Sequence, residues 1–126
     1  ISQAAAVEAL SGDQNFLKSR AEVFKKRRDF VVNSLNKIDG ITCIKPEGAF
    51  YVFPNCTGLI GKKTKNGKAL NNDEDIVTAL LEEAGVAVVQ GSAFGLQGYF
   101  RISYATSDEL LSSACERISK FCSELV

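Results

Sequence analysis

Apolar side chains recur every three or four residues in three stretches of the chain, a spacing that gathers them on one face of a helix. The first stretch follows a break at residues 11–14 and runs to Gly40, and the second runs from about residue 72 to Gly85. The third follows the capping pattern of residues 106–109. Its apolar positions step by four and three: Leu111, Cys115, Ile118, Cys122 and Leu125. We therefore expect one long helix early in the chain and two further helices after it.

A shorter, alanine-rich helix is expected over residues 2–10. Apolar side chains occupy most of its positions, so it has no continuous polar face. We expect it to pack against protein that lies outside this sequence. The chain also begins without methionine, and we interpret it as a fragment of a longer protein.

Four other stretches have the composition or length of strands: residues 41–44, 49–53, 86–89 and 99–104. The turn-forming residues 45–48 predict that the first two of these strands pair with each other. Together the patterns predict an α+β domain, with a mostly antiparallel sheet of about four strands and helices packed against it.

Length and charge narrow the possible functions. The chain has 126 residues, 45% hydrophobic and 24% charged, which indicates one globular domain. Its 15 basic residues balance its 15 acidic ones, which gives no electrostatic support for binding nucleic acid or a membrane surface. The basic run at residues 25–28 spreads around a helix and is interpreted as a solvated face. No apolar run approaches the roughly 20 residues that span a bilayer.

Residues for metal or phosphate binding are missing. The four cysteines have no C-x-x-C spacing and the chain has no histidine, so we expect no metal site. Cys115 and Cys122 are interpreted as small buried side chains, and the expected compartment is the reducing cytoplasm. Residues 61–63 do not complete a Walker A motif, and the glycines of residues 91–98 do not have dinucleotide-binding spacing.

Arg101 is the strongest candidate for a binding residue. It lies in the middle of the predicted strand 99–104, between apolar neighbours. On a rigid strand its planar guanidinium suits a carboxylate or phosphate, which it can bind through two parallel hydrogen bonds. From spacing alone, an exposed arginine whose stem covers the sheet edge remains an alternative.

Five short segments then resemble one family, the class I aminotransferases of fold type I, and most of all the bacterial aspartate aminotransferases. They are, in chain order, residues 27–29 (Arg-Arg-Asp), 46–53 (Pro-Glu-Gly-Ala-Phe-Tyr-Val-Phe), 85–89, 91–95 and 100–105 (Phe-Arg-Ile-Ser-Tyr-Ala). In this family the arginine that corresponds to Arg101 binds the α-carboxylate of the amino-acid or oxo-acid substrate.

The resemblance implies that residues 1–126 form the single small, C-terminal domain, with helices over residues 1–40 and the sheet with two further helices over residues 41–126. The large domain, which binds pyridoxal phosphate through a Schiff-base lysine, would lie upstream and is absent from this chain. We therefore expect no catalytic and no cofactor-binding residue here. The full-length enzyme is expected to be a homodimer that holds pyridoxal phosphate.

Three aromatic residues near this motif allow two interpretations. Phe94 and Tyr104 flank the proposed carboxylate site in the sequence, but core packing is the preferred explanation for both. Tyr51 is expected either at an interface with the absent domain or in the core. The turn at residues 91–95 has room for close approach to a substrate, although many relatives have proline where this chain has Gln90.

The expected function is therefore that of a C-terminal piece of an aspartate aminotransferase, inactive alone, which binds substrate through Arg101 and contributes to domain closure. The alternative is a free-standing, non-catalytic binding or interaction module that keeps this fold. A free-standing module should have a polar surface all round, whereas a piece of an enzyme should expose an apolar patch.

Overall fold

The computed structural model describes residues 1–126 and shows an α+β architecture. Its α-helices are α1 (Ser2–Ser11), α2 (Asn15–Leu35), α3 (Asp73–Ala84) and α4 (Asp108–Ser123). Two short 3₁₀ helices are η1 (Thr57–Leu59) and η2 (Gly91–Phe94). The strands are β1 (Tyr51–Val52), β2 (Val89–Gln90) and β3 (Phe100–Ser103). The expected fold class is confirmed.

The sheet has three antiparallel strands in the order β1-β3-β2, so the strand of Arg101 is the central one. About four strands were expected, but residues 41–44 form only one isolated bridge, between Thr42 and Asn55. On the edge away from Asn55, the side chain of Asn36 binds the backbone of Cys43. Its amide oxygen accepts from the backbone N–H of Cys43 at 2.8 Å, and its amide nitrogen donates to the Cys43 carbonyl at 2.9 Å. A side chain, and not another strand, therefore occupies this edge.

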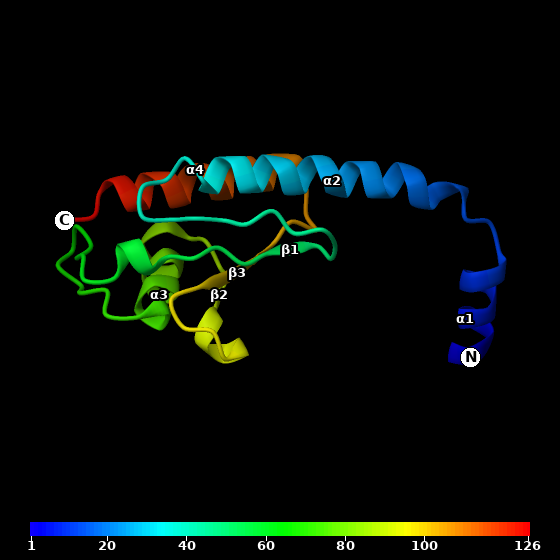
Figure 1. Ribbon diagram of the computed structural model, residues 1–126, viewed down its shortest axis with the longest axis horizontal. Helices are drawn as coiled ribbons and strands as arrows, with labels where there is room; N and C mark the ends of the chain where they lie inside the picture. The colour runs from blue at the N-terminus through cyan, green and yellow to red at the C-terminus, as the bar shows by residue number, and fades with distance from the viewer.

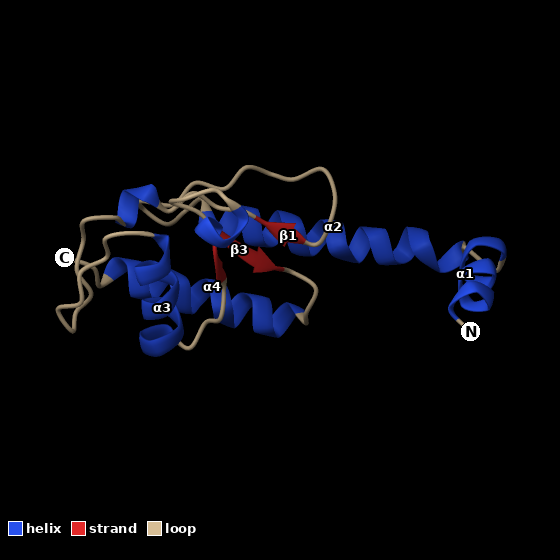
Figure 2. Cartoon of the chain, turned by 90° about the horizontal axis from the view of Figure 1, so that it is seen from below, coloured by secondary structure: helices blue, strands red, loops and turns tan.

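The helices α2, α3 and α4 cover one face of the sheet. Figures 1 and 2 show α2 and α4 side by side, and further contacts join α2 to β1 and α3 to β2. In β3, Phe100 and Ile102 are buried toward the helices. Alternate strand residues point to opposite faces, so Arg101 and Ser103 lie on the face without helices. The core includes Val31, Leu35, Val52, Ile76, Leu80, Leu111, Cys115 and Ile118.

Helices α3 and α4 begin at capping residues, and α3 ends at a glycine, as the sequence predicts. The side chain of Asn72 accepts from the N–H of Asp75 at 2.9 Å, and Ser107 caps α4 in the same way. Gly85 ends α3 in the left-handed conformation, with φ 65°. At the start of α2, Gln14 stands at the N-cap and forms no side-chain cap.

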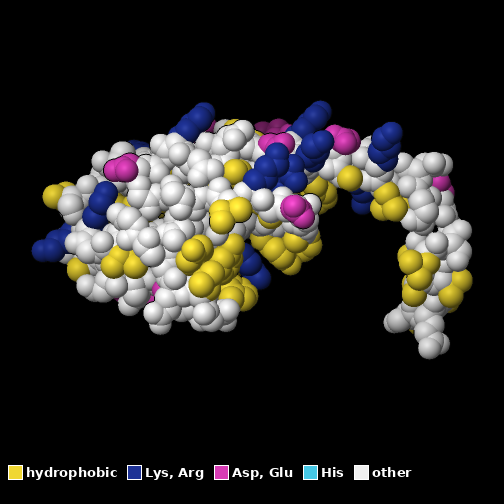
Figure 3. Space-filling model, in the orientation of Figure 1, with side chains coloured by type: hydrophobic (Ala, Val, Ile, Leu, Met, Phe, Trp, Pro, Cys, Tyr) yellow, Lys and Arg dark blue, Asp and Glu magenta, His cyan; other side chains and the backbone are white.

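Residues 1–30, which we call the arm, differ from the rest of the chain. Figure 1 shows α1 well away from the sheet, at the end of a long α2 that projects beyond it. No residue of the arm is buried. In Figure 3, apolar side chains are exposed along the arm, on both sides of its end, and on the underside of the body. The large exposed ones in the arm are Ile1, Val7, Leu10, Phe16, Leu17, Val23 and Phe30. None of the helices combines the length and the apolar character needed to cross a membrane.

Candidate functional site

The guanidinium of Arg101 lies between two aromatic rings. Its Cζ atom is 4.9 Å from the ring centroid of Tyr51 and 4.5 Å from that of Phe94. Tyr51 comes from the neighbouring strand β1, whereas Phe94 ends η2, far from β1 in the sequence. Two rings at this distance attract the cation and restrict its rotation. The side chain is only partly buried, so its donors remain within reach of a ligand.

The side chain of Arg101 forms no hydrogen bond and no ion pair with another part of the protein, unlike the side chains of Arg27 and Arg28 in α2. Arg27 pairs with Asp108 at 2.6 Å, and Arg28 pairs with Asp29 at 2.9 Å. A positioned guanidinium with its donors uncommitted suits a carboxylate, which can accept two parallel hydrogen bonds from it. The alternative of a stem lying over a sheet edge does not fit, because Arg101 belongs to the central strand.

Further aromatic side chains support the two rings. Phe53 meets Phe94 edge to face at 6.0 Å and stacks on Tyr99 at 5.7 Å. On the other side, Phe50 packs against Tyr51 with the centroids 4.4 Å apart. Such contacts between rings limit the orientations of each member. The site around Arg101 is therefore built before any ligand arrives.

Phe94 and Tyr104 have different environments in the structure. The prediction of core packing is wrong for Phe94, which is 50% exposed and stacks on Arg101. Core packing is confirmed for Tyr104, which is 2% exposed and lies on the helix-covered face. Its hydroxyl donates to the carbonyl of Ala49 at 2.9 Å, and burial raises its pKa. Tyr51 is only partly buried and lies over Arg101, so it belongs to the site.

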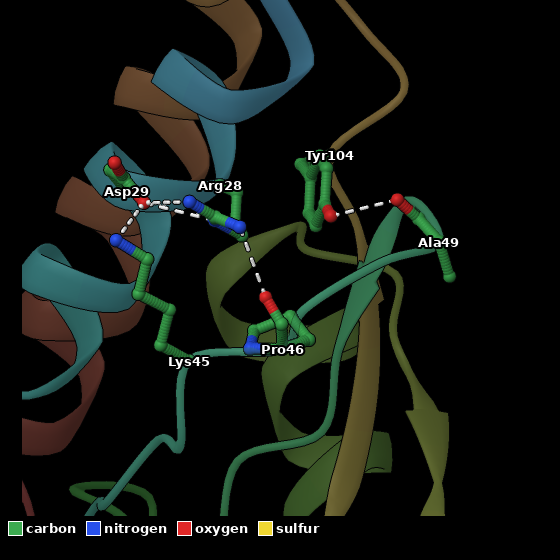
Figure 4. Close-up of polar contacts among 6 residues, drawn as sticks. All are labelled: Arg28, Asp29, Lys45, Pro46, Ala49 and Tyr104. Atoms are coloured by element: carbon green, nitrogen blue, oxygen red, sulfur yellow. Dashed lines mark hydrogen bonds and ion pairs between the residues drawn. The ribbon is translucent and has the colours of Figure 1, made fainter. Parts of the chain in front are cut away.

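A polar network fixes the segment that leads into β1 (Figure 4). Arg28 donates to the carbonyl of Pro46 at 3.1 Å, and Lys45 pairs with Asp29 at 2.9 Å. Hydrogen bonds from Lys45 and then Arg28 lower the pKa of Asp29. Ala49 has a φ of 62°, which is unusual for a residue with a side chain. Because its carbonyl is bonded to Tyr104, the segment is held on both sides just before Tyr51.

The turn that carries Phe94 is held from α3. Asp73, the first residue of α3, is 2% exposed, and its carboxylate accepts from the N–H of Ser92 at 2.7 Å. Gly91 is required here, because an added Cβ would lie 2.2 Å from the carbonyl oxygen of Leu96. The sequence pattern does not single out Asp73, because an acidic residue at the positive end of a helix is common.

This chain does not itself fit pyridoxal phosphate. A Schiff-base lysine needs an enclosed site that lowers its pKa, and no lysine of the chain is buried. No group of three or more histidine, cysteine, aspartate or glutamate side chains could hold a metal ion. The four cysteines are free and buried, and burial raises the pKa of Cys122 to about 12. Cys115 and Cys122 are therefore buried, unreactive side chains, as expected.

The chain also matches a known protein family. Residues 1–118 match the family model described as aminotransferase class I and II. The chain belongs to this aminotransferase family. It is 59% identical to a probable aspartate/prephenate aminotransferase from Rhizobium leguminosarum bv. phaseoli, over 97% of the chain and 30% of that relative. It is 58% identical to an aspartate aminotransferase from Rhizobium meliloti (strain 1021), over 99% of the chain and 30% of that relative.

Solved aminotransferase structures share the fold. The crystal structure of the aspartate aminotransferase from Rhizobium meliloti matches with a TM-score of 0.95 at 58% identity, over 99% of this chain and 31% of that one. An alanine aminotransferase from Pyrococcus furiosus matches with a TM-score of 0.83 at 36% identity, over 95% of this chain and 29% of that one. The chain thus spans about 30% of the length of the aminotransferases that it matches.

Proposed function

We propose that this chain supplies the α-carboxylate-binding site of an aspartate aminotransferase, and that Arg101 is the residue that binds. The observation that carries the proposal is the uncommitted guanidinium of Arg101, held between the rings of Tyr51 and Phe94. The names of the relatives support the reaction, which is amino-group transfer between aspartate and 2-oxoglutarate through pyridoxal phosphate.

In this proposal residues 1–126 are one C-terminal domain, with helices in residues 1–40 and the sheet with two further helices in residues 41–126. A large domain outside the chain holds pyridoxal phosphate and its Schiff-base lysine. The exposed apolar side chains of the arm support such a partner, since a patch of this kind marks an interface. The whole enzyme is a homodimer. Its free cysteines fit the reducing cytoplasm.

The contribution of this chain to the reaction is binding and orientation. Two hydrogen bonds from Arg101 fix the substrate carboxylate and with it the direction of the neighbouring Cα–H bond. Fixing a reactant in this way can supply several kcal/mol of the barrier reduction. The same contact draws the domain toward the large one and so helps to exclude water. No residue of this chain moves a proton, and the chain alone is inactive.

The proposed contact does not choose between substrates. Aspartate, 2-oxoglutarate and prephenate, the last of which is named for several relatives, all carry a carboxylate next to the amino or oxo carbon. Arg101 would bind the part that these acids share. The residue that distinguishes their side chains lies outside this chain.

Kinetics of the full-length protein test the proposal. Arg101→Ala should lower kcat/KM roughly 10- to 150-fold for both aspartate and 2-oxoglutarate. This corresponds to a loss of about 1.5–3 kcal/mol of transition-state stabilisation, because a charge-assisted hydrogen bond is lost. The matched control is Arg20→Ala, since Arg20 also lies over a ring, that of Phe16 at 5.1 Å, but in the exposed arm. Unchanged kinetics of Arg101→Ala would overturn the proposal.

The alternative, a free-standing binding module, is tested by the visible absorption of the protein made from its full gene. A longer product that takes up pyridoxal phosphate and absorbs in the visible range supports the enzyme. A colourless product of only 126 residues would support the module.

A further inference from the structure

Asp73 is a buried acid without a cation. It is one of only two buried polar residues, the other being Thr64, and no lysine or arginine forms an ion pair with it. Burying a carboxylate is costly unless its oxygens are bonded, and an apolar side chain would fill the same space more cheaply. The hydrogen bonds that this carboxylate accepts are therefore expected to have a specific structural role.

Those bonds lead to one loop, residues 91–98. The carboxylate accepts from the N–H of Ser92 at 2.7 Å, near the start of the loop. Burial by itself raises the pKa of Asp73, but hydrogen bonds from the backbone of Ser92, of Asp73 itself and of Gly98 outweigh it and lower that pKa. Asp73 is thus ionised at neutral pH, and its hydrogen bond from Ser92 holds the start of the loop.

Phe94 depends on this loop for its position. It is 50% exposed, so the core does not hold it. Its one other ring contact is the edge-to-face contact with Phe53 at 6.0 Å. The ring nevertheless lies 4.5 Å from the Cζ atom of Arg101. The backbone of the turn is what holds an exposed side chain in such a place, and Asp73 anchors that turn.

We propose that Asp73 is a positioning residue for the carboxylate site: its carboxylate holds the loop of residues 91–98 so that Phe94 stacks on Arg101. The inference rests on the proposed function of Arg101. With the loop anchored, the guanidinium is confined between two rings and presents its donors in one orientation. With the anchor lost, Phe94 moves away and Arg101 samples several orientations, of which only some fit a carboxylate.

The test uses the full-length enzyme with pyridoxal phosphate bound, in four variants: Asp73→Ala, Asp73→Asn, Phe94→Leu and the double variant Asp73→Ala/Phe94→Leu. Asp73→Ala should raise KM for aspartate and 2-oxoglutarate and the inhibition constant of succinate by about 3- to 30-fold, the effect of one lost cation–π contact. The kcat value should change less. Asp73→Asn should recover most of the loss, because its amide oxygen still accepts from Ser92.

The double variant separates positioning from general stability. If Asp73 acts through Phe94, Asp73→Ala/Phe94→Leu should have the same KM as Phe94→Leu alone. A merely structural role predicts a lower melting temperature and less active enzyme, with KM unchanged and the two substitutions additive. That pattern would overturn the inference. Phe94 is exposed, so Phe94→Leu should fold even if Asp73→Ala does not, and an unchanged KM for Phe94→Leu would also overturn it.

The variant Arg101→Ala distinguishes a failure of this inference from a failure of the proposed function. If Arg101→Ala impairs both substrates while Asp73→Ala and Phe94→Leu leave KM unchanged, only the role of Asp73 is lost. If Arg101→Ala itself is without effect, the proposed function fails and this inference fails with it.

Discussion

Helix α1 of the arm is more apolar than helix α4 of the body, yet only α4 buries its apolar side chains. Helix α1 in the arm has no buried residue, although it carries Val7 and Leu10. Helix α4 in the body buries Leu111, Cys115 and Ile118, among others, and packs against α2 and α3. The difference lies in the arrangement of the apolar residues, which form one face in α4 and are scattered around α1.

This contrast shows which parts of the chain stabilise themselves. The body, residues 31–126, encloses a core and places Arg101 on a fixed central strand. Only the last residues of the arm interact with the body, for example Arg27 with Asp108, whereas the rest of the arm presents apolar side chains that another surface must cover. Substitutions and deletions should therefore have large effects in the body and small ones in the arm.

The largest effect is expected in the core. Ile118 is fully buried, so Ile118→Ala should lower the free energy of unfolding by about 2–5 kcal/mol through lost burial and the cavity left behind. The matched change in the arm, Val7→Ala, affects a side chain that is 64% exposed and should cost less than about 0.5 kcal/mol. Urea unfolding of both variants measures the difference, and equal losses would refute the division into arm and body.

A smaller loss of stability is expected when the hydrogen bond from Tyr104 to Ala49, just before β1, is removed. Tyr104→Phe removes the hydrogen bond to Ala49 and should cost about 1 kcal/mol of unfolding free energy. Tyr99→Phe is the control, because the hydroxyl of Tyr99 donates to no protein group. Thermal unfolding of the two variants should show a clear loss only for Tyr104→Phe. A loss shared by both would mean that the hydroxyl of Tyr104 contributes nothing specific.

The ion pairs at the junction of arm and body should depend on pH. The pKa of Asp29 is lowered by Lys45 and Arg28, so its stabilising contribution is present above the unfolded-state pKa of about 3.9 and is lost as the pH falls through the folded-state pKa. Asp29→Asn should therefore destabilise near pH 7 and have no effect at strongly acidic pH. Asp39→Asn, at a residue without an ion pair, is the control. A difference that persists or grows in acid would contradict this sign.

The smallest effect is expected from removing the end of the arm. A chain that lacks residues 1–13 should unfold at the same midpoint as the 126-residue chain, because none of these residues is buried. Urea unfolding checks this expectation. A lower midpoint would show that α1 contacts the body in solution.

The helices and the central strand could be predicted from the sequence because their signals are local. The spacing from Leu111 to Cys122 is itself the contact surface of α4, and Asn72 and Ser107 cap the helices that follow them. Residues 41–44 have the composition of a strand, but they pair only at Thr42 with Asn55, and on the other edge the side chain of Asn36 binds the backbone of Cys43. Such a contact leaves no periodic pattern in the sequence.

The site was predictable only in part for the same reason. Arg101 stands out in its strand, and the family motif around it is contiguous. The rings on either side of it come from β1 and from the turn after β2, and the carboxylate that anchors this turn comes from α3. Only the fold brings Tyr51, Phe94 and Asp73 together around one guanidinium.

The most direct test of the central claim compares substrates with one and two carboxylates in the full-length Arg101→Ala enzyme. Because Arg101 is proposed to bind the carboxylate that all substrates share, kcat/KM should fall by the same factor for 2-oxoglutarate and for pyruvate as amino acceptors. A loss confined to 2-oxoglutarate would assign Arg101 to the side-chain carboxylate instead. No loss for either acceptor would remove Arg101 from the substrate site.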